Sequence, residues 1–199
     1  MEKLASQKEY FDQSFSKLDL SSSELENTSF EECEFDHCNF TSAKLVRCKF
    51  INCTFSHCNL SVAAFPGSSL YAVRFIECKI SGVDWTRAHW PSFQPDPELS
   101  FSKCILTHAS FFGLTLQCVK MDECRVNEVD FRESDLASAS ITGCDLAGSL
   151  FSHTNLRNAD LIGSWDFTLD VLNNTVTGAK FSRSEAVFLL ESLGIKLAD

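Results

Sequence analysis

The sequence has no long hydrophobic run and no clustered positive charge. No stretch approaches the roughly 18 apolar residues of a membrane span, and the polar residues 1–10 lack the apolar core of a signal peptide. The 199 residues include 17 Lys and Arg against 27 Asp and Glu, a formal charge of −10. Phosphate contacts need clustered Lys and Arg, so direct binding of nucleic acid is not expected. Membrane association is not expected either.

The motifs of common enzymes are also missing. The chain has no glycine-rich phosphate loop, no G-x-S-x-G or H-E-x-x-H motif, and no signal for a cleft with paired carboxylates. We therefore predict a protein that is not an enzyme and that uses no cofactor. Ten Cys in a chain without an export signal indicate reduced thiols and a cytoplasmic location.

Tyr and Met occur twice each, whereas Phe occurs 18 times. The large apolar residues recur every fifth position, and a run of seventeen such positions is apolar without exception. At 44% apolar composition, the chance of such a run is about one in a million, so the period is five. The run comprises Tyr10, Phe15, Leu20, Leu25, Phe30, Phe35, Phe40, Leu45, Phe50, Phe55, Leu60, Phe65, Leu70, Phe75, Ile80, Trp85 and Trp90.

After Trp90 the register slips by one residue, resumes at Phe101 and continues to Leu161; Asp166 interrupts it, and Val171, Val176 and Phe181 recover it. We call these fifth residues the centres. A second column, two residues before each centre, is mostly small and holds nine of the ten Cys. These are Cys33, Cys38, Cys48, Cys53, Cys58, Cys78, Cys104, Cys124 and Cys144.

A period of five matches neither an α-helix nor an alternating strand. Two inward residues followed by a turn describe a short strand segment and a corner, so the chain bends at every repeat. One such unit cannot bury its own large side chain, but stacked coils can. We therefore predict a solenoid of stacked coils.

The repeats Cys38-Asn39-Phe40-Thr41, Cys58-Asn59-Leu60-Ser61 and Cys144-Asp145-Leu146 resemble the pentapeptide-repeat family. The resemblance covers residues 10 to about 181. It implies an all-β fold, a right-handed quadrilateral parallel β-helix with one pentapeptide on each side, so that residues twenty apart lie above one another. The predicted parts are an N-terminal cap (1–12), a first β-helical part (13–90), a loop (91–100), a second β-helical part (101–181) and a short C-terminal α-helix with a tail (182–199).

Residues 75–104 and 181–186 are similar to the members of this family that protect DNA gyrase, namely the Qnr group, McbG and MfpA, and most closely AlbG. That resemblance implies a homodimeric, acidic rod that imitates duplex DNA at DNA gyrase or topoisomerase IV subunits. Its activity would be protection from poisons such as quinolones or albicidin. The alternative is a non-enzymatic scaffold for another protein partner.

Acidic residues concentrate in the first 36 residues and after residue 121. One interpretation is a solvated surface, in which the Asp or Asn before each centre bonds backbone amides at the corner. The other is a negative partner-binding surface. Its candidate residues are Glu24, Glu26, Glu31, Glu32, Glu34, Asp36, Asp122, Glu123, Glu128, Asp130 and Glu133.

Residues 91–100 carry three of the four Pro, and Pro removes a ladder donor, so this segment is predicted to leave the coil. It is either a harmless kink or a functional loop with Trp90, Phe93, Asp96 and Glu98 as its candidate residues. At the C-terminus, Ser182 and Glu185 have capping-box spacing and Gly194 can end the helix. The candidate residues for an end cap and a dimer seam are Phe188, Leu189, Leu190, Leu193 and Ile195.

The Cys column could suggest zinc, but successive Cys would lie on successive sides of the coil, so we interpret them as small buried hydrophobic residues. His37 and His57 also lie twenty apart, each directly before a Cys. Their phase points outward where the Cys points inward, so a Cys/His metal site is not predicted. Cys118 alone is out of register.

Overall fold

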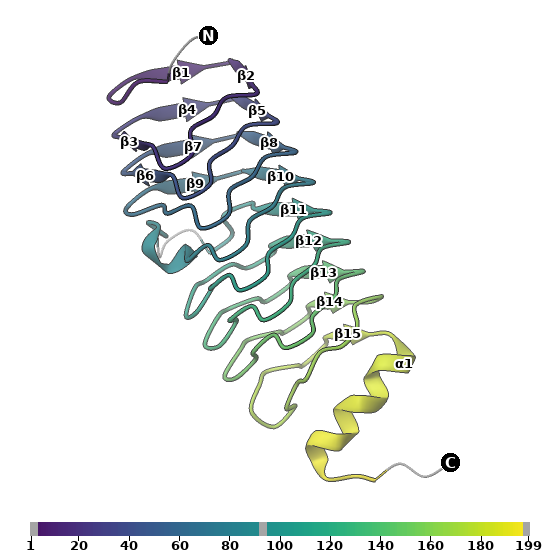
Figure 1. Ribbon diagram of the computed structural model, residues 1–199. Coiled ribbons are helices and arrows are strands. Elements are labelled where there is room, and N and C mark those ends of the chain that lie inside the picture. The colour runs from purple at the N-terminus through teal and green to yellow at the C-terminus, as the bar shows by residue number, and fades with distance from the viewer. Residues whose placement is uncertain (1–3, 92–94, 197–199) are drawn as a thin grey trace.

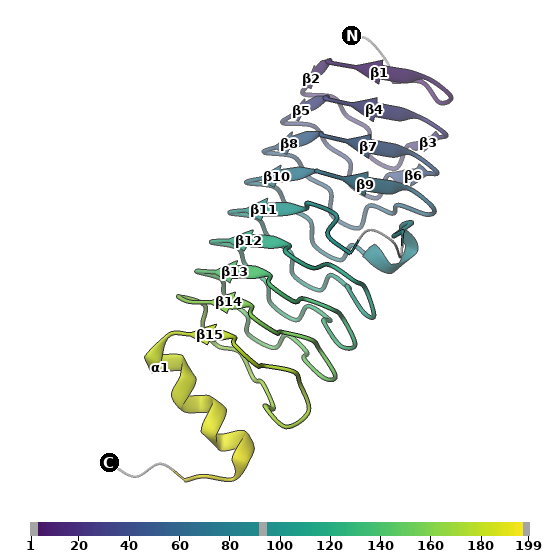
Figure 2. The same ribbon diagram turned by 180° about the vertical axis from the view of Figure 1, so that it is seen from behind.

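The computed structural model describes residues 4–91 and 95–196 and confirms the predicted fold. The chain winds into a right-handed rod of stacked coils, with short strands on its sides and parallel pairing between coils (Figures 1 and 2). Within the described ranges, no helix is long and apolar enough to cross a membrane.

One side of the rod is a nine-stranded parallel sheet that runs almost from end to end. Phe15 pairs with Phe35, and Phe35 pairs with Phe55, so each coil takes twenty residues as predicted. The strands are β2 (Ser14–Ser16), β5 (Glu34–Asp36), β8 (Thr54–Ser56), β10 (Arg74–Ile76), β11 (Ser100–Ser102), β12 (Lys120–Asp122), β13 (Ser140–Thr142), β14 (Asp160–Leu161) and β15 (Lys180–Phe181).

The other three sides have fewer regular strands. Single parallel bridges such as Asn39↔Asn59 and Asp130↔Leu150 join their remaining coils at nearly every level. The same twenty-residue step therefore operates on all four sides. One side carries the sheet of β1 (Glu9–Phe11), β4 (Ser29–Glu31), β7 (Lys49–Ile51) and β9 (Ser69–Tyr71), and another carries β3 (Glu24–Glu26) and β6 (Lys44–Val46).

The two inward columns fill the rod. Phe35 and Phe55 stack with ring centroids 4.6 Å apart, while rings on adjacent sides, such as Phe35 and Phe40, meet edge to face at 5.6 Å. Both arrangements suit the charge distribution of an aromatic ring. The small column leaves room for these rings, and all nine of its Cys are buried.

In the regular coils the residue two places after a centre forms a corner in the left-handed region, with φ of 53° at both His37 and His57. This conformation costs a residue other than Gly about 1–2 kcal/mol. The regular inter-coil hydrogen bonds offset it: the His37 N–H donates to the Ser56 carbonyl at 3.0 Å. The predicted role of the residue before the centre is also confirmed, since the Thr41 N–H donates to Asn39 Oδ1 at 3.1 Å.

The slip after Trp90 is an insertion of six residues. Arg74 in β10 pairs with Ser100 in β11, 26 residues later, where other coils take twenty. The 3-10 helix η1 (Trp85–Arg87) precedes the insertion, and Figure 1 shows it at the edge of the rod. Coil hydrogen bonds resume where the Gln117 N–H donates to the Pro95 carbonyl at 2.9 Å.

The last coil is irregular and only partly covered. Asp166 points outward, and Phe167 and Leu169 are buried in the interrupted stretch. Val176 and Phe181 are half-buried and pack against the core at this end of the rod.

The C-terminal segment forms α1 (Arg183–Ala186), continued by the 3-10 helix η2 (Val187–Leu193), across the end of the rod. Ser182 is the N-cap residue, but the capping-box expectation was wrong. The Ser182 hydroxyl accepts a hydrogen bond from the Gly163 N–H at 2.8 Å and makes none to the helix. Gly194 ends the helix in the left-handed conformation, as expected.

Candidate functional site

The structure spreads the candidate acidic residues over several sides of the rod. Glu24 and Glu26 flank the inward Leu of β3, Glu31 ends β4 with Glu32 at the next corner, and Glu34 and Asp36 belong to β5. In the second part, Asp122 ends β12 and Glu123 forms its corner, whereas Glu128, Asp130 and Glu133 lie on two other sides. The eleven residues do not form one face.

Several of these acids are neutralised by neighbouring cations. Glu26 lies 3.8 Å from Arg47, and Glu123 lies 3.7 Å from Lys103. Asp130 and Arg132 form a two-pronged pair with hydrogen bonds of 2.9 and 2.8 Å, and these bonds lower the pKa of Asp130. These carboxylates therefore contribute little net negative potential.

Exposed candidate acids without an ion pair occur on the first coils, and among the described residues Asp122 and Glu133 in the second part are exposed without an ion pair as well. Glu24, Glu31 and Glu32 are exposed, and none of them forms an ion pair within the described part of the chain. We refer to these three residues as the N-terminal acidic surface.

The candidate loop residues serve local contacts. The Trp90 indole N–H donates to the Trp85 carbonyl at 2.8 Å, which fastens the start of the insertion to η1. Asp96 accepts a hydrogen bond from the Glu98 N–H at 2.8 Å, and the Tyr71 hydroxyl donates to the Glu98 carboxylate. Phe93 lies outside the described residues.

The C-terminal helix covers the last coil and leaves apolar surface outside. Leu189 packs against the core, and Leu190 is half-buried. By contrast, Phe188, Leu193 and Ile195 are 55%, 45% and 46% exposed. A groove of about 470 Å³ runs between the helix and the last coil, with Phe167, Leu169, Phe188 and Leu189 in its wall.

The Cys column is occupied by buried, free thiols, as predicted. Each thiol bridges neighbouring coils: Cys58 Sγ donates to the Phe35 carbonyl at 3.3 Å and accepts from the Cys38 N–H at 3.3 Å. Burial raises the pKa of Cys53 to about 12. Cys118 is the exposed exception.

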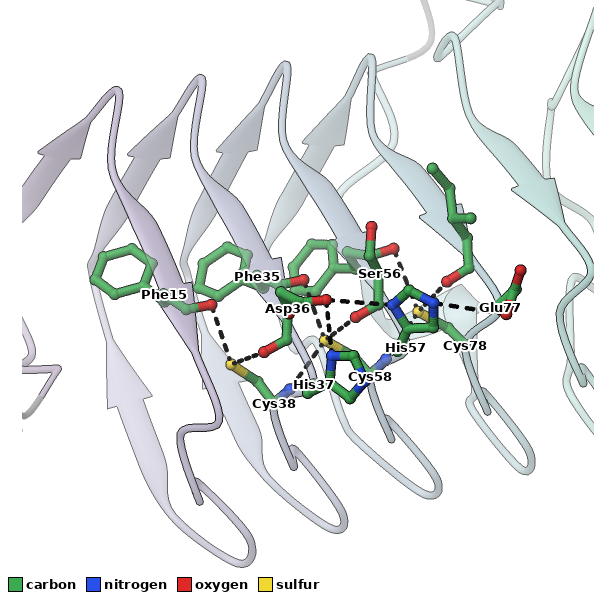
Figure 3. Close-up of polar contacts among 12 residues, drawn as sticks. Phe15, Phe35, Asp36, His37, Cys38, Ser56, His57, Cys58, Glu77 and Cys78 are labelled. Carbon is green, nitrogen blue, oxygen red and sulfur yellow. Dashed lines mark hydrogen bonds and ion pairs between the residues drawn. The ribbon is translucent and has the colours of Figure 1, made fainter.

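One group of polar residues was missed by the sequence reasoning. His37 and His57 form consecutive corners beside β5 and β8, and their rings stack with centroids 4.6 Å apart (Figure 3). Asp36 Oδ1 lies 2.9 Å from His37 Nδ1 and 3.2 Å from His57 Nδ1. Hydrogen bonds from His37 and then His57 lower the pKa of Asp36.

The outward direction of these two histidines was predicted correctly, with the neighbouring thiols turned inward. The twenty-residue spacing could also have revealed the group. Sequence reasoning paired each histidine with the Cys that follows it, whereas the partner in space is the Asp that precedes His37.

Comparisons with known proteins agree with the geometry. A family profile described as "Pentapeptide repeat region" matches residues 28–94 and 97–161. Full-length QnrB1, described as a plasmid-mediated fluoroquinolone resistance protein, is similar with a TM-score of 0.59 and 22% identity, over 94% of this chain and 100% of that chain.

A trypsin-treated variant of QnrB1 is similar with a TM-score of 0.57 and 21% identity, over 96% of this chain and 100% of that chain. No curated protein matches the sequence. The profile match covers more than half of the residues, and the period, the corners and the four-sided coil all agree with it. This chain therefore belongs to the pentapeptide-repeat family.

Proposed function

We propose that this protein binds a type II topoisomerase, DNA gyrase or topoisomerase IV, and protects it from poisons such as quinolones or albicidin. The proposal assigns no catalytic step to the protein. The observation that carries it is the similarity of the whole rod to QnrB1, which spans all of that chain. The fluoroquinolone resistance of QnrB1 supplies the functional hypothesis.

The physical basis of the proposal is electrostatic attraction to the cationic surface on which the enzyme holds DNA. Neighbouring strands, and hence coils, are about 4.8 Å apart, whereas duplex DNA carries a charge about every 1.7 Å. The rod therefore imitates DNA in shape and sign more than in charge density. The formal charge of −10 favours rapid association with such a surface, and salt should weaken the complex.

We further propose that two copies associate through their C-terminal ends. Phe188, Leu193 and Ile195 leave apolar side chains exposed on the C-terminal segment, and Leu172 in the last coil is exposed as well. A solenoid end needs a cap or a partner, and Figure 1 shows α1 and η2 at that end of the rod. Replacing Phe188 and Leu193 with Asp should convert a dimer to a monomer in light scattering coupled to gel filtration. A parent protein that is monomeric at high concentration would contradict this part of the proposal.

A supercoiling assay tests the main proposal. DNA gyrase poisoned by a quinolone, or by albicidin, should regain supercoiling activity as this protein is added, and fewer cleaved DNA molecules should accumulate. The gain should diminish as salt is raised. Absence of protection at every concentration, together with absence of binding at low salt, would contradict the proposal.

Charge variants locate the contact. A triple variant with Glu24, Glu31 and Glu32 changed to Gln should protect more weakly, because the N-terminal acidic surface loses its uncompensated charge. The matched control changes Glu26, Glu123 and Glu128 to Gln, since these acids already face Arg47, Lys103 and His108. If affinity purification from the native host recovers a protein other than topoisomerase subunits, the alternative scaffold role applies.

A further inference from the structure

Two imidazoles and one carboxylate converge at the corner between the second and third strands of the long sheet. Asp36 Oδ1 is 2.9 Å from His37 Nδ1 and 3.2 Å from His57 Nδ1, and one ligand atom from each residue lies within 4.8 Å of the others. Around a tetrahedral zinc ion with bonds of roughly 2.0–2.1 Å, neighbouring ligand atoms are roughly 3.3–3.4 Å apart. The separations from Asp36 to the two histidines lie slightly below this spacing.

The backbone holds these side chains in place. His37 and His57 are equivalent corner residues with φ of 53°, and each N–H donates to the next coil, to Ser56 and Ile76 respectively. Asp36 is the last residue of β5, and its neighbour Phe35 is buried between the rings of two adjacent coils. The side chains are half-exposed, so a metal ion can reach them without opening the rod.

We propose that Asp36, His37 and His57 form a binding site for a divalent late first-row transition metal, for which zinc is the test ion. Neutral imidazole and carboxylate are the ligand types that such ions accept together. Three protein ligands leave a fourth position for water. This proposal does not depend on the proposed function at the topoisomerase.

Glu77 lies at the next corner and contacts His57. Its Oε2 lies 3.5 Å from His57 Nε2, on the ring edge opposite the nitrogen that faces Asp36 (Figure 3). A carboxylate behind a ligating histidine fixes the tautomer and orientation of its ring. Glu77 is thus a positioning residue, and His57 presents Nδ1 to the metal.

The neighbouring thiols take no part in the site. Cys38 and Cys58 follow the two histidines directly, but both are buried and donate to main-chain carbonyls of Phe15 and Phe35. The ligand set therefore contains nitrogen and oxygen only. Because Asp36 and His37 belong to one coil and His57 to the next, a bound ion links two coils.

The experiment is a zinc titration of chelator-treated full-length protein, by calorimetry, under a reductant without thiols. A Cys118→Ser background removes the exposed thiol. One zinc ion per chain should bind, and His37→Gln or His57→Gln should weaken binding at least about 100-fold. Glu77→Gln should weaken it about 10- to 100-fold. Gln is compatible with this corner, because Gln7 has φ of 62° at an equivalent one.

The matched control is His108→Gln. His108 is also a corner residue, with φ of 58°, and lies 3.2 Å from Glu128, but no second histidine faces it. Zinc affinity should be unchanged in this variant. Zinc should also raise the melting temperature of the parent and not that of His57→Gln, because a ligand of the folded state alone stabilises it.

Three results would overturn the site. The first is the absence of saturable zinc binding by the parent. The second is unchanged affinity in both His37→Gln and His57→Gln, with circular dichroism confirming that they fold. The third is a thiolate-to-cobalt charge-transfer band when Co²⁺ replaces zinc, since the proposed ligands are nitrogen and oxygen.

Discussion

The coils before and after the insertion share one geometry and differ in what fills it. In the run from Tyr10 to Trp90, 11 of 17 centres are aromatic, whereas from Phe101 to Phe181 only 5 of 17 are. Strands β8 and β13 nevertheless belong to the same sheet, with Phe55 and Ile141 as their buried centres. The backbone thus requires a large apolar residue at every fifth position, but it accepts both aromatic and aliphatic side chains there.

The small inward column also accepts more than one residue type. From Cys33 to Cys58 five of its six residues are Cys, and in the second part Ser or Thr takes four of its positions. Ser164 Oγ donates to the Ile141 carbonyl at 2.7 Å and accepts from the Cys144 N–H at 3.0 Å. Cys58 makes the equivalent pair of bonds with its sulfur.

The outward corners differ most in chemistry. Along the long sheet the early corners are Lys17, His37, His57 and Glu77, whereas the late ones include Gly143 and Gly163. The left-handed conformation accepts Gly at no steric cost. Lys103 and Glu123 also occupy corners of this sheet, so charged corner side chains give way to Gly only at its last two corners.

The largest expected difference concerns the aromatic core. Phe55→Ala should lower the free energy of unfolding by about 3–5 kcal/mol, because its ring stacks on Phe35 at 4.6 Å and on Phe75 at 5.1 Å. Ile141→Ala, at the equivalent place in the second part, should cost about 1 kcal/mol less, since no aromatic pair is lost. Denaturant unfolding measures both. Equal losses would show that ring stacking adds nothing beyond burial.

Alkaline pH should weaken the Cys-rich coils before the others. The pKa of Cys53 rises from 9.0 to about 12 through burial. The folded state therefore keeps a proton that the unfolded state loses, so stability is complete below pH 9 and declines as pH rises toward 12. Alkylation followed by mass spectrometry should label Cys118 first and Cys53 only as the coils open. Early labelling of Cys53 below pH 9 would contradict the buried column.

Exchanging the two kinds of small residue should have a modest effect. Cys58→Ser and Ser164→Cys should each change the free energy of unfolding by about 1 kcal/mol or less, because both hydrogen bonds of the site are retained. Cys58→Leu is the contrasting control and should cost about 1–3 kcal/mol through overpacking. If Cys58→Ser were as harmful as Cys58→Leu, sulfur itself would be required.

The smallest effect is expected at Trp85, where the two parts meet. Its ring lies between Phe65 and Phe111, and its buried Nε1 has no hydrogen-bond partner among the described residues. Trp85→Phe removes that unsatisfied donor and should leave stability nearly unchanged. Trp90→Phe removes a made hydrogen bond and should cost about 0.5–1.5 kcal/mol. Thermal unfolding of the two variants compares them, and a large loss in Trp85→Phe alone would contradict this assignment.

Much of the fold could be predicted because each position within the five-residue repeat has the same structural role in every coil. The inward phase of Phe35, the burial of Cys58 and the corner bond to Asn39 all follow from position within five residues. The segments that interrupt the repeat were harder to predict from the sequence. Ser182 has a capping-box sequence, yet its hydroxyl bonds Gly163 in the coil above, a contact that no local pattern specifies.

Some features of the candidate site could likewise be predicted from the sequence, whereas others could not. Exposure of Glu24 and Glu31 could be predicted, because their positions in the repeat point outward. The neutralisation of Glu26 by Arg47 and of Glu123 by Lys103 depends on how side chains meet between coils. The convergence of Asp36 with two histidines has the same origin.

By itself, the sequence determined the period, and through it the stacking of coils, the core and the direction of the side chains in the regular coils. The reason is that burial of a large apolar residue at every fifth position requires the chain to bend at each repeat and its coils to stack. Tertiary structure alone decided which outward side chains become neighbours across coils, how far the insertion departs and what the C-terminal helix leaves uncovered. Those outcomes depend on distances of a few ångströms between residues far apart in the sequence, which periodicity does not encode.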